Sequence, residues 1–145
     1  MSGVPFHYVD LQAFCYATED EPRVERALRT FLPEEFEIER VENTGYAGDR
    51  IVVLSARVES ADAIRHVLAQ LDQLSAEEWT QLRDELDRRV TENCELYLYL
   101  DKQAALAGEV TLGKGLSFRG KVEAYPAKKE SAIENVIDAF DPLSE

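Results

Sequence analysis

Apolar side chains occupy every second position between residues 7 and 17. A period of two is that of an extended strand, whose successive side chains point to opposite faces of a sheet. One face is purely apolar and consists of Val9, Leu11, Ala13 and Cys15. The other face is polar and aromatic and consists of Tyr8, Asp10, Gln12, Phe14 and Tyr16. The alternation therefore predicts a sheet that meets a layer of helices through one of its faces.

Further strands and helices are predicted from the same kinds of pattern. Strand patterns cover residues 36–42, 51–58, 96–100 and 116–124. Helical spacing of apolar residues, with serine caps or a proline near the first turn, covers residues 18–33, 60–71 and 75–90. We expect residues 1–126 to form one domain and residues 127–145 to add an amphipathic C-terminal helix. The apolar stripe of that helix, within 131–140, packs either on its own domain or against a partner subunit.

The length and the cysteine content favour a self-sufficient soluble domain. A chain of 145 residues buries about 68–70% of its unfolded surface, so it needs no disulfide or metal to hold a core. Cys15 and Cys94 lack the spacing of a metal or redox site. No apolar run approaches the ~20 residues of a membrane span, and residues 1–5 lack the order of a signal peptide. We therefore expect a cytoplasmic protein without cofactor, metal or membrane contact.

The charge of the chain is strongly negative but unevenly distributed. The formal charge of −13 comes from 29 acids and 16 bases, of which 11 are arginine and five are lysine. Such acidity with few lysines is typical of a protein from a high-salt cytoplasm. Residues 102–129 nevertheless hold six bases and two acids, a balance of +4, so the rest carries −17. This segment is either a surface for a polyanion or a solvated face.

The segment from Leu96 to Lys121 combines a strand with candidate binding residues. Leucines alternate with Tyr97 and Tyr99, and the strand then runs into Asp101-Lys102-Gln103. A lysine offers a point charge to phosphate, and a glutamine offers a donor and an acceptor to a base or a ribose hydroxyl. Lys114 follows in a glycine-rich stretch, and Arg119 and Lys121 share one face of the last strand. We expect this basic pair to point outward beside Lys102.

A loop between two predicted strands carries a second candidate feature. Gly45 and Gly48 frame Tyr46, and Arg50 follows before the next strand. The glycines either present Tyr46 for stacking and leave Arg50 free, or they only turn a hairpin.

Three motifs follow one another in a fixed order along the chain. The first is the strand that runs into Tyr16-Ala17-Thr18-Glu19-Asp20, and the second is Gly45-Tyr46-Ala47-Gly48-Asp49. The third is Leu98-Tyr99-Leu100-Asp101-Lys102-Gln103-Ala104-Ala105, with Gly108 and Leu112 after it. In this order they resemble the motifs of an archaeal family of small proteins described as predicted exosome-associated RNA-binding proteins. The resemblance covers residues from about 7 to 125.

The resemblance implies a fold, a function and part of a site. The implied fold is α+β, with two layers and a mainly antiparallel sheet covered by helices on one face, likened to double-stranded-RNA-binding domains and to large-subunit ribosomal protein five. The implied function is RNA binding without catalysis, associated with RNA processing or degradation by the exosome. The matching positions are Tyr46, Gly48, Asp101, Lys102 and Gln103. Our own electrostatic interpretation adds Lys114, Arg119 and Lys121, and our interpretation of the glycine-framed loop adds Arg50.

Three hypotheses follow for the function. The first is a module that binds structured or double-stranded RNA, reading backbone shape and 2′-hydroxyls with the surface of residues 102–121. The second is an assembly module or homodimer that meets its partner through 131–140 or through Tyr97 and Tyr99. The third is a small enzyme built on Asp101 and Lys102 with Asp10 and His7, although no nucleophile–base pair or phosphate-cradling motif is recognisable.

Overall fold

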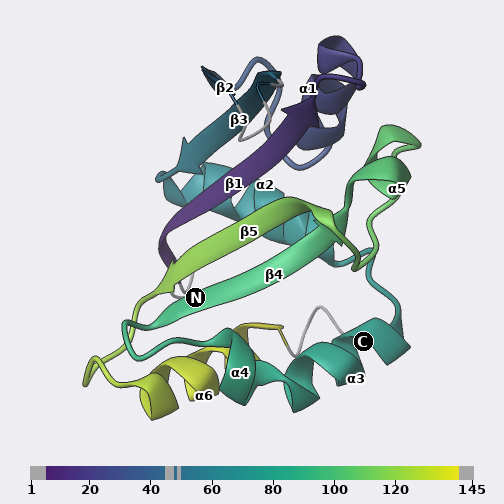
Figure 1. Cartoon of the computed structure of the whole chain (residues 1–145). Coiled ribbons are helices and arrows are strands. Elements are labelled where there is room, and N and C mark those ends of the chain that lie inside the picture. The colour runs from purple at the N-terminus through teal and green to yellow at the C-terminus, as the bar shows by residue number, and fades with distance from the viewer. Residues whose placement is uncertain (1–5, 45–47, 49, 141–145) are drawn as a thin grey trace.

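The protein is built on one five-stranded antiparallel sheet (Figure 1). The computed structural model describes residues 6–44, 48 and 50–140. The strands are β1 (Phe6–Tyr16), β2 (Glu39–Thr44), β3 (Arg50–Val58), β4 (Glu95–Asp101) and β5 (Gly115–Val122). Their order across the sheet is β2-β3-β1-β5-β4, and every neighbouring pair is antiparallel. The N-terminal strand is therefore central, with β3 on one side and the late strand β5 on the other.

Among the residues that the structure describes, six helices accompany the sheet and leave one of its faces open. They are α1 (Glu21–Arg29), α2 (Ala61–Leu71), α3 (Ala76–Asp84), α4 (Leu86–Arg89), α5 (Lys102–Leu106) and α6 (Lys129–Phe140). In Figure 1, α2 lies behind the sheet, whereas α3, α4 and α6 gather beyond β4. The face of the sheet turned to the viewer is crossed by no described helix. This arrangement confirms the predicted α+β fold, including its C-terminal helix. Within the described residues, no helix is long and apolar enough to cross a bilayer.

The hydrophobic core lies between the sheet and the helices. The predicted apolar face of β1 is buried, and each of its four side chains is at most 2% exposed. Leu96, Leu98 and Leu100 of β4 and Phe118 of β5 are buried on the same side. Burial of each such side chain contributes roughly 1.5–3 kcal/mol. The alternation along these strands therefore determines which face of the sheet the helices cover.

Three boundaries differ from the sequence-based expectation. The single helix predicted for residues 75–90 breaks at Glu85, whose φ and ψ are −101° and 1°. Periodicity did not reveal the break, because Leu82 and Leu86 stay buried on both sides of it. The second strand begins at Glu39 rather than at Phe36, and Phe36 and Ile38 pack on the core from the connection instead. The exit of β4 forms the short helix α5.

The C-terminal helix packs on its own domain. Ala132 and Val136 are 0% and 1% exposed, and Val136 lies beside Leu82 of α3 and Leu96 of β4 around a small apolar cavity. Asn135 donates a hydrogen bond of 2.7 Å to the carbonyl oxygen of Glu123. Of the two alternatives for the apolar stripe, the described structure adopts docking within the chain. The domain boundary at residue 126, and a partner at 131–140, stay predictions.

Candidate nucleic-acid interface

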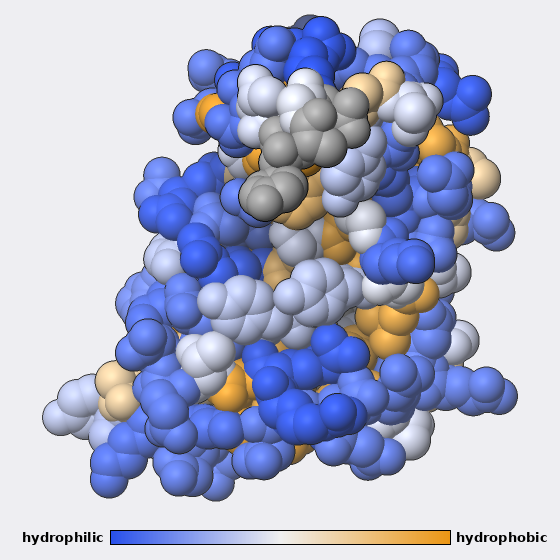
Figure 2. Space-filling model, in the orientation of Figure 1, coloured by the Kyte–Doolittle hydropathy of each residue, from blue (hydrophilic) through white to orange (hydrophobic). Residues whose placement is uncertain are grey.

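The open face of the sheet is made of the residues that alternate with the core residues. The strand register aligns them in rows that run across the sheet. One row is Arg57, Asp10, Arg119 and Tyr97, and the next is Ser55, Gln12, Ser117 and Tyr99. A third row is Tyr8, Lys121 and Glu95, and two shorter rows pair Val53 with Phe14 and Ile51 with Tyr16. We call this set the open face; Figure 2 views the molecule from this side and shows pale, weakly polar side chains across the middle between blue margins.

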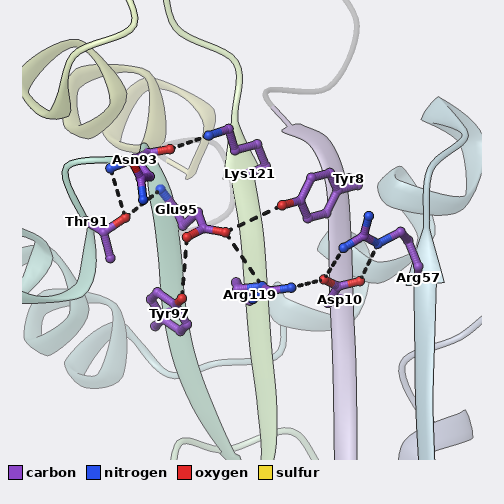
Figure 3. Close-up of polar contacts among 9 residues, drawn as sticks. All are labelled: Tyr8, Asp10, Arg57, Thr91, Asn93, Glu95, Tyr97, Arg119 and Lys121. Carbon is purple, nitrogen blue, oxygen red and sulfur yellow. Dashed lines mark hydrogen bonds and ion pairs between the residues drawn. The ribbon is translucent and has the colours of Figure 1, made fainter.

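A belt of paired charges crosses the open face (Figure 3). Asp10 lies between two arginines and accepts two hydrogen bonds of 2.8 Å from Arg57 and a further short one from Arg119. Burial by itself would raise the pKa of Asp10, but the bonds from Arg57 and Arg119 outweigh it and lower that pKa. Asp10 is therefore ionised and holds both guanidinium groups over the centre of the sheet.

Glu95 extends this belt to the edge strand. Its carboxylate accepts hydrogen bonds of 3.5 Å from the hydroxyls of Tyr8 and Tyr97, and it lies 3.8 Å from Nε of Arg119. The hydrogen bond to Asp10 is the main reason why the pKa of Arg119 is raised above its ordinary value. Two arginines and two carboxylates thus balance one another, so the centre of the open face is nearly neutral in a chain of charge −13.

Beyond the belt the open face is aromatic. Phe14, Tyr16 and Tyr99 are 40%, 51% and 50% exposed. Gln12, Ser55 and Ser117 lie between them as uncharged hydrogen-bonding groups. Exposed rings beside such groups suit unpaired bases, which stack on aromatic side chains and offer their edges for hydrogen bonds. The face is therefore equipped for stacking more than for attraction of phosphate.

Lys102, the principal predicted contact, is buried. It is 7% exposed, and its Nζ lies 2.8 Å from both carboxylate oxygens of Glu19 and donates to the carbonyl oxygen of Phe14 at 2.8 Å. Burial would raise the pKa of Glu19, but its hydrogen bond from Lys102 lowers it, together with one from the backbone of Tyr16. In this structure the ammonium group ties the end of β1 to α5 and is not turned to solvent.

The residues around Lys102 have structural tasks as well. Asp101 caps α5, because its carboxylate accepts a hydrogen bond of 2.9 Å from the backbone of Ala104. A Cβ on Gly113 would lie 2.6 Å from the Cβ of Asp101, so this glycine serves close approach within the protein. Gln103 is exposed on α5, and Lys114 is exposed in the loop before β5. Both remain available to a ligand.

The basic pair on β5 faces outward as predicted but lies elsewhere than expected. Arg119 and Lys121 are half-buried on the open face, while Phe118 and Val122 are in the core. In the strand register, Lys121 lies opposite Glu95 at the start of β4, and Asp101 comes six residues further along that strand. At about 3.3 Å per residue, roughly 20 Å separates this end of the strand from Lys102. The expectation that the pair lies beside Lys102 is wrong, because antiparallel pairing reverses the order of the strand.

Gly48 and Arg50, the described residues of the predicted loop site, lie at the other edge of the sheet. Arg50 is exposed at the start of β3, and its Nη2 is 3.9 Å from Oε1 of Glu21. Gly48 has a φ of +86°, which favours glycine. Tyr46 lies outside the described residues. Arg50 and Lys121 are thus at distant places on the sheet, and the predicted site residues do not form one cluster.

The residues of the enzymatic alternative are not assembled either. Asp10 pairs with arginines, Asp101 caps a helix, and Lys102 bonds to Glu19. His7 lies 3.4 Å from Glu123 with more than half of each side chain exposed. Within residues 6–44, 48 and 50–140, no group of histidine, cysteine, aspartate and glutamate is suited to hold a metal ion.

Sequence reasoning missed two groups of surface residues. A sequence pattern could have revealed Phe14 and Tyr16, since these aromatic residues stand at positions of β1 where alternation predicts the exposed face. No sequence pattern pointed to Arg88 and Arg89. They reach the edge of β4 because the helix breaks at Glu85, and they line a hollow with Tyr97 and Tyr99.

Comparisons with known proteins point to one family. A family model described as RNA binding matches residues 8–122. RNA-binding protein PAB1135 of Pyrococcus abyssi is 36% identical over 139 residues, and the match covers 90% of each chain. The solved structure of Mth689 from Methanothermobacter thermautotrophicus, a DUF54 protein, is 37% identical with a TM-score of 0.79 and covers 94% of this chain and 98% of its own. Protein AF2318 of Archaeoglobus fulgidus, also assigned to DUF54, has a TM-score of 0.83 at 28% identity and covers 92% and 99%.

Proposed function

Because this chain belongs to the RNA-binding family whose model matches residues 8–122, we propose that it binds RNA through the open face of its sheet and catalyses no reaction on it. The observation that carries the proposal is the exposure of Phe14, Tyr16 and Tyr99 around a row of uncharged polar side chains. Stacking of splayed bases on the aromatic side chains of an open sheet is a recurrent mode of RNA recognition. Each stacked base contributes about 1–3 kcal/mol.

The charge distribution favours stacking over attraction of phosphate. Arg57 and Arg119 are compensated by Asp10 and Glu95, and the whole chain carries −13. Long-range attraction of a polyanion is therefore weak. If the protein works at high salt, as its acidity suggests, weak long-range attraction matters little for RNA binding, because the Debye length falls to about 3 Å at 1 M.

The site residues predicted from the sequence have different roles in this proposal. Arg119 and Lys121 are on the open face, and Gln103 and Lys114 are exposed at its margin, where we propose contacts to phosphate or ribose. Arg50 is exposed on the helix side of β3, beside Glu21 of α1, and its contact with RNA stays a prediction from the sequence. Lys102 becomes a positioning residue that holds the carbonyl of Phe14. Tyr46 stays a prediction from the sequence. Since exposed rings reach unpaired bases and not those inside a helix, we favour unpaired segments of structured RNA over uniform duplex.

A role in RNA processing or degradation with the exosome, and a cytoplasmic location, extend the proposal and rest on family resemblance. Isolation of the tagged protein from cells at native salt, with and without ribonuclease, tests the association with the exosome. Retention of exosome subunits after ribonuclease treatment supports direct association, and their loss indicates a link through RNA.

The assembly alternative has less support. The apolar side of α6 is already buried within the chain, because Ala132 and Val136 pack on the domain. The outward edge of β4 is covered at both ends, by Thr91 bonded to Glu95 and by Gly113 bonded to Tyr99. Light scattering on the full chain tests it, since a stable dimer that dissociates on substitution of Tyr97 and Tyr99 would favour assembly over RNA binding.

The decisive experiment removes the rings from β1. We expect Phe14→Ala combined with Tyr16→Ala to weaken binding of a single-stranded RNA by well over tenfold, from two lost stacks. Tyr125→Ala is the matched control, because Tyr125 is 99% exposed and lies outside the open face. Fluorescence anisotropy over a salt series measures the affinity, and circular dichroism checks the fold. Equal affinity of the double variant and the control would overturn the open face as the binding site.

A further inference from the structure

Two adjoining hollows lie along the edge of β4, between α3 and α4 on one side and the loop before β5 on the other. Their volumes are about 510 and 500 Å³, and both are lined by Arg89 and Tyr99. Small-molecule sites typically have about 300–1,000 Å³, so each can hold a nucleotide. We call them together the edge groove, lined chiefly by Gln81, Arg88, Arg89, Tyr99, Gly113 and Lys114.

We propose that the edge groove takes one unpaired nucleotide of the RNA, with its base stacked on Tyr99 and its phosphate held between Arg88 and Lys114. The inference rests on the proposed function and names the kind of RNA that the protein selects. A duplex without an unpaired nucleotide offers no free base face, because each base is stacked on both sides and paired at its edge.

Hydrogen bonds tie the helical wall of the groove to the edge of β4. Arg89 donates to Glu85 at 2.8 and 2.6 Å, and its Nη1 lies 3.5 Å from the carbonyl oxygen of Tyr97. The side chain thereby covers the middle of the β4 edge, between Thr91 and Gly113. Because this edge is closed to an added strand, a ligand in the groove meets side chains and not a free backbone ladder.

The opposite wall is the loop that presents Lys114. Glu78 accepts a hydrogen bond of 2.6 Å from the backbone of Leu112, and Gly113 donates one of 3.1 Å to the carbonyl of Tyr99. Gly113 also packs directly on Asp101. The backbone on either side of Lys114 is therefore anchored, while its side chain has no ion pair among the residues that the structure describes.

The charges of the groove complement a phosphate. Arg88, Arg89 and Lys114 stand against Glu78 and Glu85. Glu78 is occupied by backbone N–H groups of Ser75 and Leu112, and Glu85 is occupied by the two arginines. The Arg88 side chain is 76% exposed and pairs with Glu85 at 3.1 Å. An exposed ion pair of this kind contributes little free energy, so a phosphate can displace Glu85 and bind the guanidinium group of Arg88.

Tyr99 provides the stacking platform. It is 50% exposed, and its hydroxyl has no hydrogen-bond partner within the described part of the chain. Its ring borders both hollows, so that a base can lie on it while the attached phosphate reaches either wall. Ring and cations thus come from three separate elements, β4, α4 and the loop before β5.

The test compares two RNA hairpins that differ by one bulged nucleotide, 2-aminopurine, in full-length protein. We expect the bulged hairpin to bind at least tenfold tighter than the continuous one, with quenching of the 2-aminopurine fluorescence. Tyr99→Leu should abolish the quenching and lower affinity for the bulged hairpin about tenfold, without changing affinity for the continuous one. Arg88→Ala with Lys114→Ala should reduce the slope of log K against log salt by about 0.7, since the contact to one phosphate is lost.

Matched controls separate this inference from the proposed function. Tyr125→Ala and Lys128→Ala alter exposed residues outside the groove and should leave both readouts unchanged. If the groove variants bind the bulged hairpin like the unchanged protein while Phe14→Ala with Tyr16→Ala weakens it, the edge groove is wrong and the open face stands. If no RNA binds at any salt concentration, the proposed function fails and the inference fails with it.

Discussion

The ammonium group of Lys102 lies 2.8 Å from the carbonyl oxygen of Phe14, across 88 residues of sequence. This contact joins the start of α5 to the end of β1, where Phe14 and Tyr16 present their rings. Lys102 Nζ also lies 5.5 Å from the centre of the Tyr16 ring. The lysine that sequence reasoning assigned to phosphate therefore holds the aromatic strand in place.

Replacement of Lys102 should affect stability first. Lys102→Ala leaves Glu19 partly buried without its cation, and we expect the free energy of unfolding to fall by about 2–3 kcal/mol. Urea denaturation measures this loss. RNA affinity should fall only modestly, and the salt slope should stay as in the unchanged protein, because no phosphate contact is removed. A salt slope reduced by about 0.7 would instead indicate direct contact with phosphate.

Replacement of Asp10 should strengthen RNA binding. Asp10→Asn removes the charge that engages Arg57 and Arg119, so both guanidinium groups become available to phosphates on the open face. We expect affinity at low salt to rise several-fold, with a salt slope steeper by up to about 1.4. Anisotropy titrations at several salt concentrations measure both quantities. Asp84→Asn, which removes an exposed carboxylate on α3, controls for net charge; an equal gain in this variant would mean that no release of arginines is involved.

Stability should depend on pH through two carboxylates. The pKa values of Asp10 and Glu19 are lowered from their ordinary values of 3.8 and 4.5. A folded-state pKa below the unfolded one gives stability that is fully present above the unfolded pKa and is lost as pH falls through the folded pKa. The midpoint of thermal unfolding should thus be flat above about pH 5 and should drop below about pH 4. In the Asp10→Asn variant the midpoint of thermal unfolding should fall less at low pH. An unchanged fall would refute the role of Asp10 in the pH dependence of stability.

Gly115, the first residue of β5, should tolerate a side chain less well than Gly108. At Gly115, φ is +106° and a Cβ would lie 2.6 Å from the Cβ of Lys102, whereas at Gly108 φ is +78° with nothing within 4 Å. Gly115→Ala should cost about 2–4 kcal/mol, from backbone strain and overlap together. Gly108→Ala should cost about 1–2 kcal/mol, from strain alone. Chemical denaturation of both variants ranks them, and equal losses would contradict the close packing at Gly115.

Local patterns were sufficient for the faces of the strands and for the caps of the helices. The alternation of β1 predicted that Leu11 is buried and Phe14 exposed, and both are as predicted. The serine at position 75 and Glu78 form the predicted capping box. These features could be read from the sequence because a period of two, or a contact three residues away, depends only on neighbouring residues.

Which charges meet, and which remain free, was decided by the tertiary structure. Asp10 and Arg119 are 109 residues apart in sequence and become neighbours only because β1 and β5 pair in one register. The same pairing places Lys121 far from Lys102, and the burial of Lys102 depends on Glu19 and Phe14 from the opposite end of the chain. Charge counted along the sequence located a basic segment, but the tertiary structure determined that Lys102 is buried and that Arg119 is paired with Asp10. The aromatic face and the edge groove are what remain open to a ligand.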